Sequence, residues 1–260
     1  MRCRLCGTAG LELFYTQGNE DEFRFYRCPE CRLVNYDLSG GLDQEKYERR
    51  QPDPRDDDAP LNRPQTLSWE FLRRRFPRPA RLLEIGCGNG RLLHLAREAG
   101  WQVRGLELSP SLAASVSERL GVQVEVAEFP GFEPEDACRF DVVVLRHVLE
   151  HLPDGKAALQ EIRGLLDEGG HAFLEFPNIE ALDLRAQRWL RRTGLHRKSY
   201  PAGYVPGHAN EYGRHSFQRL LDETGFQLVA WQTYSYDPIR NFVYNRWHVG
   251  DKARAIARRR

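Results

Sequence analysis

A regular alternation of short apolar strands and amphipathic helices, which begins near residue 80, constrains the fold more than any other sequence feature. The expected strands cover residues 81–85, 101–108, 122–126, 140–145 and 171–176. The expected helices cover residues 91–100, 110–120 and 155–166. Strands that alternate with helices form a parallel sheet whose two faces are both covered. The sequence therefore predicts an α/β fold with a Rossmann-like, doubly wound and mostly parallel sheet.

A glycine-rich turn follows the first of these strands, in LLEIGCGNG. Gly86, Gly88 and Gly90 allow the backbone to approach a ligand closely and to turn sharply into a helix with free N-terminal amides. A dinucleotide fingerprint would require glycine where Arg91 stands. The next strand ends in Glu107, whose carboxylate can accept hydrogen bonds from a ribose diol. These features together indicate an adenosine-type cofactor at the carboxyl edge of the sheet.

Four of the six cysteines lie near the N-terminus as two Cys-x-x-Cys pairs, Cys3 with Cys6 and Cys28 with Cys31. Four thiolates in two tight turns match the tetrahedral coordination of structural zinc. Two disulfides and a redox pair are the alternatives. A reducing cytoplasm disfavours the disulfides, and the position of both pairs near the terminus, outside any βαβ unit, argues against the redox pair. We expect a zinc ribbon in which the ion takes the place of a hydrophobic core.

The composition excludes several classes of function. The chain has 41% hydrophobic and 29% charged residues and a net charge of +1, so bulk charge does not predict a nucleic-acid partner. No apolar run approaches the roughly 20 residues of a membrane helix, and no signal peptide is recognisable. We therefore expect a cytoplasmic protein that does not bind membranes, and its charge balance disfavours nucleic acid as a partner.

The segment RHVLEHLPD follows the fourth central strand and carries His147, Glu150 and His151. The spacing is that of an inverted zinc-protease motif, but Pro153 ends any helix too early for that site. Three interpretations stay open: a general base, for which His147 is favoured because it lies closest to the end of the strand; a second metal site formed by all three residues; or local packing against the cofactor. We name His147 and His151 as the catalytic candidates.

Five segments, in order and spacing, resemble the class I S-adenosylmethionine-dependent methyltransferases: LLEIGCGNG, GLELSP, FDVVVLRHVLEHLPD, LLDEGGHAFLEFPN and HSFQRLLDETGFQL. The resemblance covers about residues 67–232. The preceding cysteine module is similar to a bacterial subset with an N-terminal zinc ribbon, whose members often act on sugars or other small metabolites. Some quinone O-methyltransferases carry a similar Glu-His pair that helps to hold a divalent ion.

The resemblance implies S-adenosylmethionine as the cofactor and a set of residues around it. The methionine part would be surrounded by Glu84, Gly86, Cys87, Gly88 and Gly90. Glu107 would bind the ribose hydroxyls, and Ala127 and Glu128 would flank the adenine. Glutamate at position 84 replaces the more usual aspartate, and the segment AEFPGFEP is unusual for the adenine side.

The predicted organisation has four parts. They are a zinc ribbon (1–40), a linker (41–65), a methyltransferase domain (66–236) with a substrate lid inserted at 178–213, and a C-terminal extension (237–260). The expected reaction is methyl transfer to a hydroxyl or carbon of a sugar or related small metabolite. A nucleotide-linked sugar could use His196, Arg197 and Lys198 of the lid. An RNA methyltransferase and a non-catalytic cofactor-fold protein are the alternatives.

Overall fold

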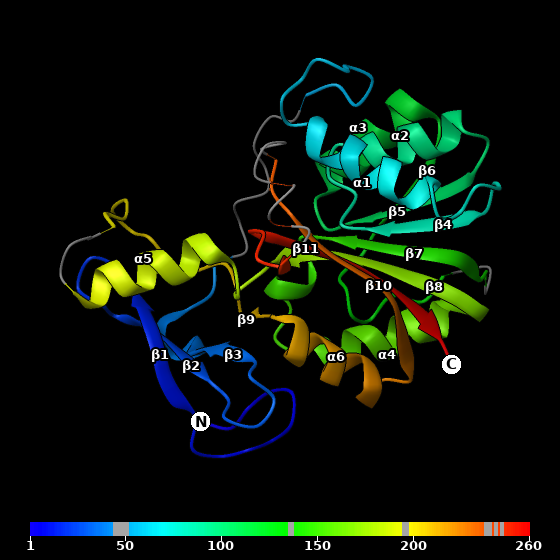
Figure 1. The fold of residues 1–260 in the computed structure, drawn as a ribbon. Helices are drawn as coiled ribbons and strands as arrows, with labels where there is room; N and C mark the ends of the chain where they lie inside the picture. Colours follow the sequence, from blue (N-terminus) through cyan, green and yellow to red (C-terminus); the bar gives the residue numbers. More distant parts are fainter. Residues whose placement is uncertain (44–51, 135–137, 194–197, 237–240, 242–243, 245–246) are drawn as a thin grey trace.

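The computed structural model describes the chain except for residues 44–51, 135–137, 194–197, 237–240, 242–243 and 245–246 (Figure 1). It contains a seven-stranded mixed sheet covered by helices and a smaller four-stranded antiparallel sheet beside it (Figure 1). Among these residues no helix is both long enough and apolar enough to cross a bilayer. The α/β architecture predicted from the strand and helix alternation is confirmed.

The large sheet has the strand order β10-β11-β8-β7-β4-β5-β6. Its strands are β4 (Arg81–Ile85), β5 (Gln102–Glu107), β6 (Gln123–Val126), β7 (Phe140–Arg146), β8 (Leu166–Pro177), β10 (Phe226–Tyr234) and β11 (Lys252–Arg259). The pairs among β6, β5, β4, β7 and β8 are parallel, whereas β11 runs antiparallel to both of its neighbours. The order changes direction around β4, so the carboxyl ends of β4 and β7 form the switch point where ligands bind in such sheets.

Helices cover both faces of this sheet (Figure 1). They are α1 (Arg63–Arg73), α2 (Arg91–Glu98), α3 (Pro110–Leu120), α4 (Gly155–Leu165) and α6 (Arg214–Glu223). The first three bury their apolar faces in one core cluster, and α4 and α6 bury theirs in another. Ser109 caps α3 and Asp154 caps α4 by accepting hydrogen bonds from backbone amides at the third helical positions, Leu112 and Ala157.

The small sheet belongs mainly to the N-terminal module. It consists of β1 (Glu12–Gln17), β2 (Phe23–Arg27), β3 (Val34–Tyr36) and β9 (Asn210–Glu211), and a 3-10 turn (Leu38–Gly40) follows β3. The ring of Phe25 stacks between Tyr15 and Tyr36, at centroid distances of 4.5 and 4.9 Å. Because β9 comes from the region before α6, this sheet joins segments that are about 175 residues apart in the sequence.

The predicted C-terminal extension and the predicted linker both pack against the methyltransferase domain, which the sequence pattern did not indicate. β11, which falls within the predicted C-terminal extension, lies between β8 and β10 in the large sheet. The described part of the predicted linker packs against the glycine turn: Asn89 donates to the Pro52 carbonyl at 3.1 Å, and Arg91 donates to the Pro54 carbonyl at 2.8 Å. Arg91 is only 2% exposed, because linker backbone and the Asp57 carboxylate surround its guanidinium. The polar composition of the linker did not predict this packing, because backbone carbonyls, which the composition does not reflect, accept most of the hydrogen bonds.

Candidate active site

A cavity of about 500 Å³ opens at the carboxyl ends of β4, β5 and β7. The residues predicted to bind the cofactor that line it are Gly86, Cys87, Gly88, Glu107, Ala127 and Glu128. His147 and His151 line the same cavity from the segment after β7. Glu84 and Gly90 are not among the lining residues. The volume and the mixture of apolar and polar walls suit a small cofactor together with part of an acceptor.

The glycine turn has a backbone shape that side chains would prevent. Gly86, Gly88 and Gly90 have φ angles of +70°, +54° and +77°. A Cβ on Gly86 would lie 2.6 Å from Val148 Cγ2, and one on Gly90 would lie 2.6 Å from a Val116 methyl. Gly90 does not line the cavity, and its missing side chain lets the start of α2 pack closely on α3. Gly86 and Gly88 line the cavity, where the absence of side chains lets a ligand approach the backbone.

Glu107 connects this turn to the next strand. Its Oε2 accepts a hydrogen bond from the Gly88 amide at 2.8 Å, and its Oε1 accepts from the amides of Leu108 and Ser109 at 2.9 and 3.1 Å. A carboxylate has about four lone-pair positions, so three backbone amides leave acceptor capacity for a ligand hydroxyl. The side chain lines the cavity and is 7% exposed. Glu107 thus fixes the shape of the turn and can still bind a ribose.

Glu84 lies at the end of β4 and is 1% exposed. Burial raises its pKa to about 8, although the charge of Arg146 acts in the opposite direction. Its Oε2 has no hydrogen-bond partner among the described residues. A buried acceptor without a partner beside a cavity fits a ligand that brings a donor, such as the ammonium group of a methionine moiety.

His147 is held as a charged group. Its backbone has φ +55°, and its Nδ1 lies 3.3 Å from Glu150 Oε1 while Nε2 lies 3.5 Å from Glu175 Oε1. Burial by itself lowers the pKa of His147, but the two carboxylates outweigh it and raise the pKa to about 9. A pKa of about 9 keeps the imidazole protonated at neutral pH, which does not suit a general base.

A buried network behind His147 was not found by sequence reasoning. Arg146 lies 3.2 Å from Glu175 Oε1, and Ser68 of α1 donates to Glu175 Oε2 at 2.6 Å. Burial opposes ionisation of Glu175, yet the Arg146 and His147 charges hold its pKa well below the usual range. Glu175 sits within an apolar strand, HAFLEF, and a charged residue at an inward position of such a strand is the signal that could have identified it.

His151 has the properties of a base. Its Nδ1 lies 2.6 Å from the Gly207 carbonyl, so Nδ1 carries the proton and Nε2 is the acceptor in the neutral ring. Burial lowers the pKa of His151, even though Glu150 acts to raise it. The neutral form therefore predominates at pH 7. His151 lines the cofactor cavity, which places it where an acceptor would meet the methyl donor.

Three potential metal ligands also meet here. Glu150, His151 and His208 each offer a donor atom, and these atoms lie within 4.8 Å of one another. Glu150 Oε2 is buried and has no hydrogen-bond partner among the described residues. His147 contacts Glu150 but does not belong to this group, so the geometry replaces the expected third ligand His147 by His208. The set could hold one divalent cation.

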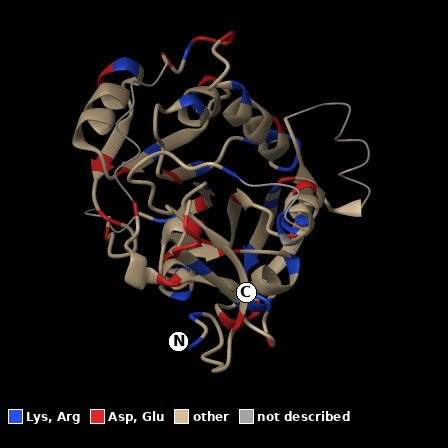
Figure 2. Cartoon of the chain, turned by 90° about the vertical axis from the view of Figure 1, so that its left-hand side faces the viewer, with Lys and Arg blue, Asp and Glu red and all other residues tan. Residues whose placement is uncertain are grey.

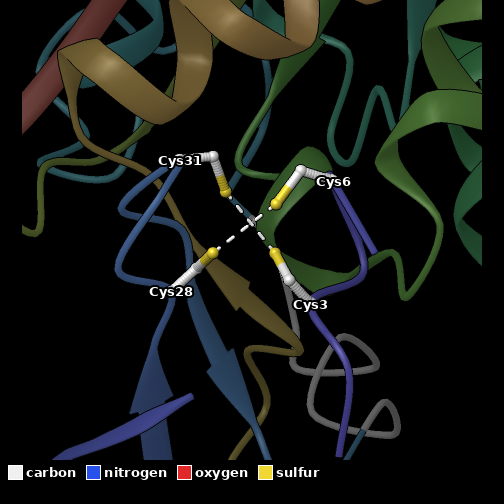
Figure 3. Close-up of side chains that lie close together, drawn as sticks. All are labelled: Cys3, Cys6, Cys28 and Cys31. Atoms are coloured by element: carbon white, nitrogen blue, oxygen red, sulfur yellow. Dashed lines mark hydrogen bonds between the residues drawn. The ribbon is translucent and has the colours of Figure 1, made fainter. Parts of the chain in front are cut away.

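The four N-terminal cysteines converge on one point (Figure 3). The Sγ atoms of Cys3 and Cys31 lie 3.4 Å apart and those of Cys6 and Cys28 lie 3.5 Å apart, distances far longer than a disulfide bond of about 2.05 Å. Four thiols at these separations, three of them buried, match the edges of a tetrahedron around zinc. The residues present therefore fit the predicted ion, whereas two disulfides do not fit.

The lid region contributes more to packing than to the cavity. Tyr200 exchanges backbone hydrogen bonds with the Asn19 side chain, and Tyr204 donates to Gln17, so both side chains lie against the ribbon. Tyr212 is 2% exposed. His196 and Arg197, proposed from the sequence to bind phosphate, lie outside the described residues.

Comparisons with known proteins agree with this geometry. The family model described as "Methyltransferase domain" matches residues 61–230. A ubiquinone biosynthesis O-methyltransferase of Xanthomonas axonopodis pv. citri (strain 306) is 35% identical over 186 residues, which are 66% of this chain and 77% of that protein.

Solved structures show the same fold. The magnesium protoporphyrin IX methyltransferase of Synechocystis PCC 6803, solved with bound SAH, superposes with a TM-score of 0.56 at 16% identity, over 77% of this chain and 84% of that one. The PH0226 protein of Pyrococcus horikoshii OT3 gives a TM-score of 0.60 at 18% identity, over 84% and 100%. With the glycine turn, Glu107 and the strand order in place, the chain belongs to the methyltransferase-domain family and is a class I S-adenosylmethionine-dependent methyltransferase acting on a small molecule.

Proposed function

We propose that this enzyme methylates a hydroxyl group of a sugar or a related small metabolite. The observation that carries the proposal is His151, a neutral imidazole that lines the cofactor cavity with Nδ1 held by the Gly207 carbonyl. A hydroxyl is a weak nucleophile until a base removes its proton, and a neutral histidine suits that step near pH 7. The O-methyltransferase relatives support oxygen as the acceptor atom rather than carbon.

In this proposal the residues at the site have separate roles in binding the cofactor and in methyl transfer. Glu107 and the glycine turn position the adenosyl part, and Ala127 and Glu128 flank the base. Glu84 does not line the cavity, but its buried Oε2 has no partner among the described residues, and we assign the amino group to it. The bound cofactor supplies an activated methyl group on a sulfonium. The protein then has to align the acceptor oxygen with that methyl and exclude water, while His151 takes the proton of the hydroxyl.

His147 has a positioning role in this proposal. Its charged ring lies between the carboxylates of Glu150 and Glu175 and keeps both of them ionised and in place. The backbone amide of His147 also donates to the Glu175 carbonyl at 2.7 Å, which fixes the loop after β7. The ordered loop then presents His151 to the cavity.

A cation-assisted reaction is the second candidate, because Glu150, His151 and His208 bring their donor atoms together. A divalent ion at this place would lower the pKa of a coordinated hydroxyl, so that no protein base would be required. The two candidates are distinguished by the rate after chelation and after addition of Mg²⁺ or Mn²⁺. A rate that is unchanged by chelators favours the base, and a rate that requires the cation favours coordination.

The test of the proposal uses His151→Gln with the exposed His215→Gln as a matched control. Transfer of a labelled methyl group is measured on a panel of sugars, nucleotide-linked sugars and phenols. We expect kcat on the accepted compound to fall by about 10²–10⁴-fold in His151→Gln, with the S-adenosylmethionine Kd unchanged. A kcat within twofold of the wild-type value would remove His151 from the mechanism, and exclusive methylation of RNA would overturn the acceptor class.

We also propose that zinc at Cys3, Cys6, Cys28 and Cys31 is structural. All four tetrahedral positions would be filled by thiolates, which leaves none for a substrate or water. The support is the convergence of the four sulfur atoms at the base of a sheet that has few core residues of its own. Elemental analysis of the purified protein, with an expected ratio of one zinc per chain, tests this.

A further inference from the structure

A second cavity, of about 550 Å³, lies between the ribbon sheet, the helix α5 (Leu182–Arg192) and the segment just before β11. It shares no lining residue with the cofactor cavity. Its walls come from four parts of the chain, with Phe14 and Val34 from the ribbon, Trp189 from α5, Arg214 from the start of α6, and Trp247 from the segment before β11. The proposed reaction uses none of these residues.

The charge of this cavity is strongly one-sided. The basic residues that line it are Arg27, Arg32, Arg185, Arg188, Arg214 and His248, whereas Glu180 is the single acidic lining residue. Over the rest of the described chain, basic and acidic residues are interspersed (Figure 2), in keeping with the net charge of +1. The concentration of guanidinium groups around one hollow is therefore local and does not follow from the overall composition.

The five arginines of the cavity have no close carboxylate partner among the described residues. Within the described ranges, none of the five forms an ion pair with a carboxylate at 4.0 Å or less. Arg27 and Arg188 both lie over the ring of Phe14, at 5.1 and 4.8 Å from its centroid. Burial lowers the pKa of Arg188, and burial with the neighbouring Arg214 lowers that of His248. Like charges gathered in this way favour an anion with several oxygens.

Two tryptophans add a second kind of contact. Trp189 and Trp247 line the cavity and are 63% and 67% exposed, so most of each indole faces solvent. A single exposed aromatic residue is common on a protein surface, but two of them at one basic cavity offer flat faces for stacking a ring next to bound phosphates. The cavity is open to solvent, and its volume of about 550 Å³ is that of a small-molecule site.

We infer that this cavity binds a nucleoside diphosphate group, with the arginines on the phosphates and a tryptophan on the base. The inference does not depend on the identity of the methyl acceptor. The ligand could be the nucleotide part of an acceptor or a free nucleotide that acts as an effector, because both present the same diphosphate and ring.

Calorimetric titration of the full-length protein with uridine 5′-diphosphate, inorganic pyrophosphate and uridine tests the inference. We expect the diphosphate to bind more tightly than pyrophosphate, and uridine to bind weakly. The double variant Arg185→Gln/Arg214→Gln should raise the Kd for the diphosphate at least tenfold, and Trp189→Ala should raise it for the nucleotide but not for pyrophosphate. The matched control is Arg78→Gln, an exposed arginine outside the cavity, and melting curves confirm that each variant is folded.

Competition experiments complete the test. Saturating S-adenosylhomocysteine should leave diphosphate binding unchanged, since the two cavities share no wall. Displacement by it, an unchanged Kd in the double variant, or no binding at millimolar diphosphate would each overturn the inference. A single-stranded RNA that binds a hundredfold more tightly than the diphosphate would also overturn it. A raised KM for a nucleotide-linked acceptor in the double variant identifies the acceptor as the source, and a changed turnover of a nucleotide-free acceptor identifies an effector.

Discussion

Replacement of Glu107 by alanine tests the part of the site on which cofactor binding depends most. The carboxylate accepts three backbone hydrogen bonds, from Gly88, Leu108 and Ser109, at 2.8, 2.9 and 3.1 Å. One of these bonds fixes the glycine turn on β4, and the other two fix the entry to α3. The variant therefore loses both the ribose acceptor and the support of the turn.

The magnitude follows from the number and kind of these bonds. A hydrogen bond to a charged group contributes about 1.5–3 kcal/mol net. In the variant, water replaces in part the two local bonds to Leu108 and Ser109. We therefore count the loss of one hydrogen bond, to the turn or to the ribose, in the binding free energy of S-adenosylmethionine. A loss of about 1.5–3 kcal/mol corresponds to a Kd for S-adenosylmethionine that is roughly 10–150-fold higher.

The assay is calorimetric titration with S-adenosylmethionine, and Glu118→Gln, an exposed carboxylate on α3, is the control. A cofactor analogue without the ribose 2′-hydroxyl separates the two roles of Glu107. If the side chain binds the ribose, the analogue binds less tightly than the cofactor to the wild type but equally to Glu107→Ala. A folded Glu107→Ala variant with wild-type affinity would refute the assignment.

Three further predictions concern the ribbon and the buried acid. Cys28→Ser should reduce the zinc content and lower the Tm, because the ribbon depends on the ion, and a zinc-free variant with an unchanged melting curve would contradict this. Glu84 has a pKa of about 8 in the folded protein, above the ordinary value of 4.5, so its contribution to stability is lost as the pH rises between these two values. In urea titrations the wild type should lose up to about 1.4 kcal/mol of unfolding free energy per pH unit relative to Glu84→Gln. A difference between the two proteins that does not change with pH would refute this prediction. Arg4→Met should lower kcat with little change in S-adenosylmethionine affinity, because the Arg4 guanidinium holds Ala209 and Asn210 beside the loop of His151. An unchanged kcat would show that the ribbon does not influence catalysis through this contact.

The large sheet and the cofactor side were accessible from the sequence because their signals are local. Apolar runs such as RLLEI predict strands, the glycines of the turn have positive φ angles, and Glu107 ends its strand as expected. The family resemblance then gave the cofactor. The position of β11 inside the large sheet was not predicted, because KARAIARR places its small alanines and Ile256 in a strongly basic tail. Only the pairing with β8 and β10 shows that this stretch is buried.

The acceptor side could not be predicted to the same extent, since it is built from long-range contacts. The sequence favoured His147 as the base because it lies closest to the end of the strand, and the partners of the two rings favour His151 instead: two carboxylates lie around His147 and one backbone carbonyl lies at His151. His208 meets Glu150 although 58 residues separate them. The basic cavity at the ribbon likewise collects arginines from three separate segments, none of which has a distinctive local pattern.

The N-terminal ribbon contacts the segments that form the acceptor side of the site, and these contacts give the ribbon a role in positioning the proposed base. The Arg4 guanidinium donates to the side chain of Asn210 and to the carbonyl of Ala209. The Ala209 amide in turn donates to the Glu150 carbonyl at 2.9 Å, one residue before the proposed base His151. β9 is also the fourth strand of the ribbon sheet. Because the glycine turn and Glu107 have no contact of this kind with the ribbon among the described residues, an ordered ribbon should matter for the acceptor and the base more than for the cofactor.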